Sequence, residues 1–203
     1  MHENNVSEQS AAVAEPHDVL SPTIQALVAH NREFAANKEY ERYRTDKYPD
    51  KKLAIVTCMD TRLTELLPAA FGLKNGDAKI IKVAGAEVSH PFGSVMRSLL
   101  IAVCELGVED VMIVAHTSCG AQHMDGSSMV EAMESLGVAE DRIRLAEHCG
   151  VDFNRWLAGF GDTEKAVRES VAMVREHPVM PPLVRVTGWI MDSETGEIVQ
   201  VDC

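Results

Sequence analysis

The stretch LAIVTCMDTR, residues 53–62, decides the fold of this 203-residue chain. Its first six residues form a short, continuous apolar run, which is typical of a β-strand buried on both faces of a parallel sheet. The thiol of Cys58 ends this run, and the carboxylate of Asp60 and the guanidinium of Arg62 follow. The stretch therefore predicts a central strand that carries polar, reactive side chains to one edge of a sheet.

Strand-like and helix-like segments alternate along the rest of the chain. Further strands are expected at 79–83, 111–115, 183–191 and 198–201, and helices at 62–71, 93–106, 127–136 and 163–176. Such alternation implies right-handed crossovers and a largely parallel sheet. We therefore expect an α/β fold whose mostly parallel central sheet is flanked by helices. The last two strands, joined by a tight turn at 193–196, are expected to form a hairpin at one edge.

The N-terminal region is expected to differ from this α/β body. Residues 1–20 are polar and aperiodic and predict a mobile arm, so that 21–203 would be a single domain. Ser21 and Pro22 favour a helix start, and apolar residues recur at helical spacing through 23–37. We expect this amphipathic N-terminal helix to pack on its own subunit or on another one.

Composition restricts the partners and the compartment. A net charge of −12 argues against nucleic acid and anionic membranes, and no apolar run reaches the ~20 residues that a membrane-spanning helix needs. The start of the chain lacks the order of a signal peptide. An odd number of cysteines, five, favours a reducing, cytoplasmic location with free thiols. Cys104 lies in an apolar run and is expected to behave as a small structural hydrophobe.

A second motif, HTSCG at residues 116–120, follows the expected strand 111–115. In open α/β sheets, ligands bind outside the carboxyl ends of the strands, so Cys58, His116 and Cys119 can converge if their strands are neighbours. Two thiols and one imidazole match a zinc site with three protein ligands. A structural zinc site would normally have a fourth Cys or His close in sequence, and only His123 is near. The pattern therefore indicates a catalytic zinc ion in the 21–203 domain.

Other interpretations of these residues remain open. Cys58, His116 and Cys119 could be unrelated buried residues, although all three lie at strand ends beside charged groups. A phosphatase-like anion loop would need five residues between its Cys and Arg, whereas three separate Cys58 from Arg62. A redox thiol would need a Cys-x-x-Cys pair, which Cys58 lacks. Asp60 could also be a plain helix cap.

Taken together, Cys58-x-Asp60-x-Arg62 and His116-x-x-Cys119-Gly120 resemble the motifs of the β-class carbonic anhydrases, and the similarity extends over residues 22–202. The resemblance implies zinc held by Cys58, His116 and Cys119, with water, hydroxide or Asp60 in the fourth position. Arg62 would pair with Asp60, and the backbone N–H of Gly120 would position a substrate oxygen. Such proteins are dimers or larger, so a homodimer or homotetramer is expected.

The implied reaction is reversible hydration of CO2 to bicarbonate and a proton, by attack of zinc-bound hydroxide. The chain lacks the upstream Gln that many members use, which leaves Lys79 or Lys82 as substrate-positioning candidates. His90 and His123 are candidate proton shuttles by their ordinary pKa. Two alternatives remain. One is hydrolysis of carbonyl sulfide or carbon disulfide on the same fold, and the other is a non-catalytic zinc- or anion-binding protein.

Overall fold

The computed structural model describes residues 20–203, so the predicted arm lies, apart from Leu20, outside the described residues. The chain divides into two compact units after Arg44. The first contains α1 (Pro22–Ala36) and the short 3-10 helix η1 (Glu39–Tyr43). The predicted start of α1 is confirmed, because the Ser21 hydroxyl accepts the N–H of Ile24 at 3.3 Å. No side chain of α1 is buried.

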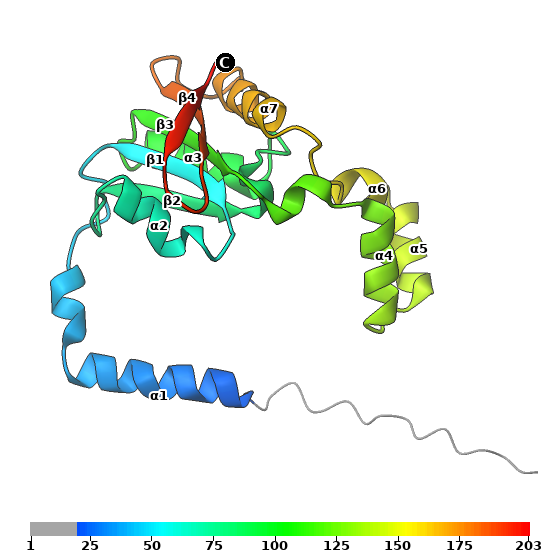
Figure 1. Ribbon diagram of the computed structural model, residues 1–203, viewed down its shortest axis with the longest axis horizontal. Coiled ribbons are helices and arrows are strands. Elements are labelled where there is room, and N and C mark those ends of the chain that lie inside the picture. Colours follow the sequence, from blue (N-terminus) through cyan, green and yellow to red (C-terminus); the bar gives the residue numbers. More distant parts are fainter. Residues whose placement is uncertain (1–19) are drawn as a thin grey trace, which may run out of the picture. The chain divides into compact units, whose positions relative to one another are not determined.

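The second unit is built on a mostly parallel sheet, as predicted (Figure 1). In the described residues, five strands follow the order β2-β1-β3-β4-β5. Their bounds are β1 (Leu53–Cys58), β2 (Ala78–Val83), β3 (Asp110–His116), β4 (Arg185–Met191) and β5 (Ile198–Val201). The pairs β1–β2, β1–β3 and β3–β4 are parallel, and β4–β5 is the antiparallel edge hairpin that the sequence predicts. The first and third strands are therefore neighbours.

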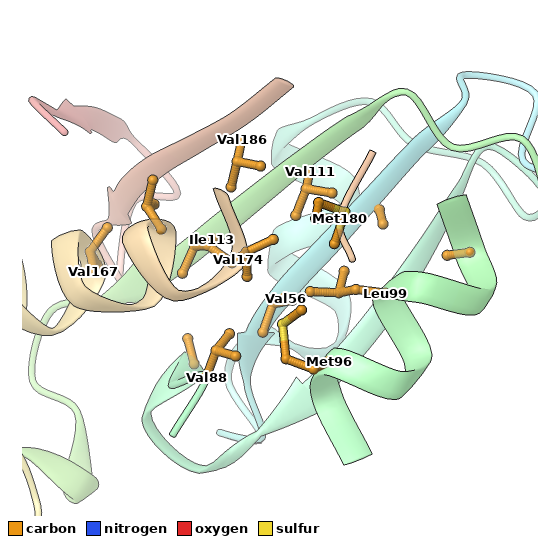
Figure 2. Packing of buried hydrophobic residues seen from close by; sticks show 14 of the residues in the cluster. Val56, Val88, Met96, Leu99, Val111, Ile113, Val167, Val174, Met180 and Val186 are labelled. Carbon is orange, nitrogen blue, oxygen red and sulfur yellow. The ribbon is translucent and has the colours of Figure 1, made fainter. Parts of the chain in front are cut away.

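Helices cover both faces of this sheet. The helices that pack on the sheet are α2 (Leu63–Ala70), α3 (Ser94–Cys104) and α7 (Thr163–Arg175). Two further helices, α4 (Gly126–Ser135) and α5 (Glu140–His148), lie between α3 and α7 in the sequence. Side chains of α3 and α7 pack with one face of the strands in a core that Figure 2 shows from close by. Leu63 and Leu67 of α2 pack in a second cluster, against Ile55 and Val114 on the opposite face. Alternation along buried strands accounts for the two cores.

Several features differ from the expectation. The helices α5 and α6 (Phe153–Trp156) were not predicted, because α5 buries only Ile143 and α6 is a single turn. The short 3-10 helices η2 (Ala84–Ala86) and η3 (Gly120–His123) were not predicted either. The expectation that Cys104 behaves as a small structural hydrophobe is wrong, since this residue is exposed at the last position of α3. No helix in the described part of the chain is long and apolar enough to cross a membrane.

Candidate metal centre

The sheet topology brings the three predicted metal ligands together. Cys58 ends β1 and His116 ends β3, which lies beside β1. Beyond His116 the chain turns through Ser118, whose φ of 53° lies in the left-handed region, before it reaches Cys119. One ligand atom from each of Cys58, His116 and Cys119 lies within 4.8 Å of the other two. Residues 58 positions apart in sequence thus converge at the carboxyl edge of the sheet.

The spacing and burial of these atoms suit a zinc ion. The two thiol sulfurs, Cys58 Sγ and Cys119 Sγ, lie 3.8 Å apart. Two sulfurs bound tetrahedrally at about 2.3 Å from zinc would be separated by about 3.8 Å. Cys58, His116 and Cys119 are 4%, 1% and 6% exposed, so the ligand atoms are shielded from bulk water. The donor set and its spacing therefore fit zinc.

The ring of His116 is oriented as a metal ligand requires. Its Nδ1 lies 2.8 Å from the backbone oxygen of Thr117, which fixes the proton on Nδ1 because a carbonyl only accepts. The Nε2 atom then carries a lone pair. Among the described residues, it is the one buried side-chain nitrogen or oxygen atom without a hydrogen-bond partner. A buried acceptor without a partner costs free energy unless something binds it, and a metal ion would do so.

Asp60 and Arg62 form a rigid pair beside these ligands. Arg62 donates from Nε to Asp60 Oδ1 at 3.0 Å and from Nη2 to Oδ2 at 2.8 Å, which is a bidentate contact. The backbone N–H of Arg62 also donates to Oδ1. Asp60 Oδ2 lies 3.9 Å from His116 Nε2. The carboxylate is therefore held beside the three candidate metal ligands.

Arg62 is itself fixed by groups that the sequence did not single out. Its Nη2 donates to the backbone oxygen of Ser118 at 2.9 Å, and its Nη1 to the Ser193 hydroxyl at 3.3 Å. The backbone N–H of Ser193 donates to Thr117 Oγ1 at 3.0 Å. A hydroxyl in the turn after β4 lies at the same sheet edge as His116, and that shared edge is the signal that could have pointed to Ser193.

The charges of the site depend on this geometry. The Arg62 hydrogen bonds hold the pKa of Asp60 well below its ordinary range, so Asp60 is ionised at neutral pH. Burial alone would raise the pKa of Cys58. The neighbouring His116 and Cys119 side chains and the backbone N–H groups of Asp60 and Gly85 together outweigh burial and lower this pKa to about 7. Burial raises the pKa of Cys119.

The other residues that the sequence suggested for substrate binding or proton transfer have fewer contacts with the metal-ligand residues. Gly120 follows Cys119 at the start of η3, and the space that its missing side chain leaves is open. Lys82 Nζ donates to the backbone oxygen of Asp60 at 3.2 Å, whereas Lys79 Nζ donates to the backbone oxygen of Lys47. His90 and His123 are exposed, and His90 Nδ1 accepts the N–H of Phe92. Lys82 thus contacts the segment that contains Asp60, whereas Lys79 contacts Lys47 instead.

Comparisons with known proteins agree with this geometry. A family model described as carbonic anhydrase matches residues 53–198. "Putative carbonic anhydrase YvdA" of Bacillus subtilis is 51% identical over 176 residues, covering 87% of this chain and 89% of that protein. A carbon disulfide hydrolase of Acidithiobacillus thiooxidans is 27% identical, covering 82% and 85%. The crystal structure of β-carbonic anhydrase isoform I from Trichomonas vaginalis matches with a TM-score of 0.77 and 30% identity, covering 90% and 98%. The chain belongs to the β-carbonic anhydrase family.

Proposed function

We propose that this chain catalyses the zinc-dependent, reversible hydration of CO2 to bicarbonate and a proton. The observation that carries the proposal is the ionised Asp60 carboxylate, which Arg62 holds 3.9 Å from the unpartnered Nε2 of His116. A site that only stored a metal ion would not need a fixed carboxylate beside its ligand atoms. The carbonic anhydrase model match and the 51% identity to YvdA support the same reaction.

Cys58, His116 and Cys119 would hold the zinc ion, since two thiolates and one imidazole are a known catalytic set. When bound, zinc would supply the Lewis acidity that makes water a nucleophile near neutral pH. The hydrogen bond between His116 Nδ1 and Thr117 keeps the imidazole in the tautomer whose Nε2 can bind. The N–H groups of Asp60 and Gly85 stabilise the Cys58 thiolate. The chain thus favours the binding tautomer of His116 and the thiolate form of Cys58, which binding needs.

Asp60 would orient the attacking water. An ionised carboxylate is only an acceptor, so Asp60 Oδ2 can take a hydrogen bond from a water molecule but cannot donate one to the wrong group. The bidentate contact with Arg62 fixes the direction of Oδ2. Arg62 is fixed in turn by Ser118 and Ser193, which limits the freedom of the pair. The proposed role of Asp60 is therefore to position the nucleophile and to accept its proton.

The substrate would lie on the Gly120 side of the ligands, where the structure leaves open space. The backbone N–H of Gly120 would donate to an oxygen of CO2, as the family resemblance implies. Sulfur accepts hydrogen bonds more weakly than oxygen does, so this contact favours CO2 over carbon disulfide. The relative that acts on carbon disulfide is 27% identical, which makes that substrate the main alternative to test.

One set of assays tests the proposal. Purified, zinc-loaded protein is tested by stopped flow for CO2 hydration and, in parallel, for hydrolysis of carbonyl sulfide and carbon disulfide. We expect CO2 hydration to have by far the largest kcat/KM. Full zinc occupancy without CO2 hydration would contradict the proposal. Hydrolysis of carbon disulfide under the same conditions would then assign the alternative reaction, and the absence of all three activities would indicate a non-catalytic site.

A further inference from the structure

Glu87 lies on the metal side of its segment. It follows η2 with extended backbone angles (φ −84°, ψ 139°), between Ala86 and Val88. These two neighbours are 2% and 3% exposed and belong to the core with α3 and α7, where Figure 2 labels Val88. The Glu87 carboxyl instead lies against Gly85 beside the ring of Phe160, which packs in the other cluster, with Cys58 and Cys119. The Glu87 side chain is partly buried there.

The Glu87 carboxyl lies beside Gly85, and the backbone of Gly85 borders the Cys58 thiol. A Cβ placed on Gly85 would be 3.0 Å from Glu87 Oε2 and 2.7 Å from the ring of Phe160, so both side chains lie against the Gly85 backbone. The backbone N–H of Gly85 lies beside the Cys58 thiol and helps to lower its pKa. Phe160 packs in the same cluster as Cys58 and Cys119. The carboxyl thus lies against the backbone segment that borders the Cys58 side of the metal centre.

This position is fixed by α7. The N–H of Val88 donates to the hydroxyl of Ser170, a buried residue of α7, at 3.0 Å. The preceding residue of the helix, Glu169, is the titratable group that acts electrostatically on Glu87. The Glu169 side chain is 68% exposed and lies 3.7 Å from Lys165 Nζ. Two carboxylates therefore lie in succession, one beside Gly85 and the other at the surface.

CO2 hydration releases one proton in each turnover, and that proton must reach the solvent. Asp60 can accept this proton only transiently, since Arg62 keeps the pKa of its carboxyl low, so a second group must carry the proton onward. Lys82 Nζ is engaged by the Asp60 backbone and by Thr64. Glu87, in contrast, has no hydrogen bond or ion pair to another side chain of the described residues. Burial, with a smaller contribution from the charge of Glu169, raises the pKa of Glu87.

We infer that Glu87 is a proton-relay residue, which carries the proton of CO2 hydration from the metal centre to the solvent near Glu169. The inference rests on the proposed function. In each turnover the Glu87 carboxylate accepts the proton released when water adds to CO2, and it then passes this proton to a buffer base or to Glu169. The carboxylate is regenerated, and bicarbonate leaves as the other product. A carboxyl whose pKa lies nearer to the working pH suits such a transfer better than an ordinary one.

The test compares wild type with Glu87→Gln, which keeps the shape of the side chain but cannot carry a proton. At low buffer concentration we expect kcat to fall by about tenfold, a loss kept modest because buffer can replace part of the relay. The value of kcat/KM should stay near that of wild type, since it reports the steps before proton release. A small base such as imidazole at high concentration should restore kcat.

Two controls and one spectroscopic readout complete the test. Glu176→Gln changes an exposed carboxylate at the C-terminal end of α7 and should leave every parameter unchanged. Glu87→Asp keeps an acid and should retain part of kcat without added base. In the infrared difference spectrum of wild type minus Glu87→Gln, the band of a protonated carboxyl should persist above about pH 4.3, where an ordinary Glu ionises.

The outcomes separate this inference from the proposed function. Unchanged kcat at low buffer concentration, or a parallel loss of kcat and kcat/KM that base does not restore, would overturn the relay. So would a Glu87 band that disappears at the pH of an ordinary Glu. A zinc-loaded wild type that does not hydrate CO2 would overturn the proposed function and the relay with it. If the wild type hydrates CO2 and Glu87→Gln has the same kcat at low buffer concentration, the relay is wrong and the proposed function stands.

Discussion

At the scale of single residues, the unpartnered Nε2 of His116 is the clearest indication that this side chain binds a metal ion. We expect purified protein to carry about one zinc ion per chain, because the three buried ligand atoms form one site. Cys58→Ser, His116→Ala and Cys119→Ser should each weaken zinc binding by more than about 100-fold, beyond the usual loss for a partner of a ligand. Metal analysis and competition with a chelator measure this. Cys104→Ser, at an exposed cysteine, is the matched control, and full zinc retention in any ligand variant would remove that residue from the site.

Asp60 and Arg62 should matter for turnover more than for metal affinity. Asp60→Asn keeps the shape of the side chain but removes its negative charge. That charge accepts the proton of water and forms the ion pair with Arg62. We expect near-normal zinc content and a loss of CO2 hydration of about 10²-fold or more. Arg62→Ala should also be impaired, because the freed carboxylate can bind the metal itself. Wild-type rates in Asp60→Asn would reduce Asp60 to a helix cap.

The raised pKa of Glu87 makes a separate prediction about stability. A carboxyl whose folded pKa lies above its unfolded value binds more protons when folded, so it favours folding at low pH. That contribution is lost as the pH rises through the folded pKa. Glu87→Gln does not ionise, and its stability relative to wild type should therefore increase between about pH 4 and pH 7. Urea unfolding at both values measures the difference, and a relative stability that is the same at both would contradict the raised pKa.

The sequence predicted the metal ligands for a physical reason, and the same reason explains what it missed. Cys58 and His116 end apolar strands, and parallel strands in one sheet bring their carboxyl ends to a common edge. Gly85 contributes through its backbone N–H, and Ser193 through a hydroxyl in a turn. Neither type of group has a distinctive spacing in sequence. Glu87 becomes notable only once Gly85 and Ser170 show where its side chain lies.

At the scale of elements, η2 follows β2 and passes beside Cys58 through a turn that needs a left-handed residue at Gly85. Gly85 has φ of +67° and a Cβ there would lie 2.7 Å from Phe160, whereas Gly72 has φ of +61° with nothing within 4 Å. Gly85→Ala and Gly72→Ala should both lose about 1–2 kcal/mol of stability from the left-handed backbone. Only Gly85→Ala should also weaken zinc binding, because its N–H would move away from Cys58. Equal zinc affinity in both variants would show that the Gly85 N–H does not support the thiolate.

The prediction of elements succeeded where burial is strongest. The strands and the helices α3 and α7 have apolar positions at clear periods because they share one large core. α5 buries a single residue, Ile143, and its charged sequence gives little periodic signal. The exposed Cys104 shows the reverse error, since an apolar run on α3 does not say which of its residues face the sheet. Tertiary contacts decide such positions.

At the scale of the whole molecule, the topology followed from few observations. Alternating strands and helices predict parallel pairing, and the turn at 193–196 predicts the antiparallel pair of β4 and β5. The order β2-β1-β3-β4-β5 could not be read from the sequence. It depends on which crossovers place α3 and α7 on one face and α2 on the other. In this order β1 and β3 are neighbours, which brings Cys58 and His116 to the same place on the sheet edge.

The assembly of the molecule depends on what covers α1. Ile24, Leu27 and Val28 are 43%, 61% and 37% exposed, and they lie on one stripe of a helix that buries no side chain. An uncovered apolar stripe of this kind is a liability for a monomer in water. We therefore expect a homodimer or homotetramer in which α1 packs against a second copy of the chain.

Charged substitutions on α1 test this expectation without deleting the helix. Leu27→Glu should shift the assembly toward monomers, because it places a charge on the apolar stripe. Ala29→Glu is the matched control, since at 100° per residue it lies on the opposite side of α1 from Leu27. Light scattering at several protein concentrations measures the mass of each variant, and circular dichroism checks that the fold is kept. An assembly that is the same in wild type, in Leu27→Glu and after removal of residues 1–37 would show that α1 is not part of the interface.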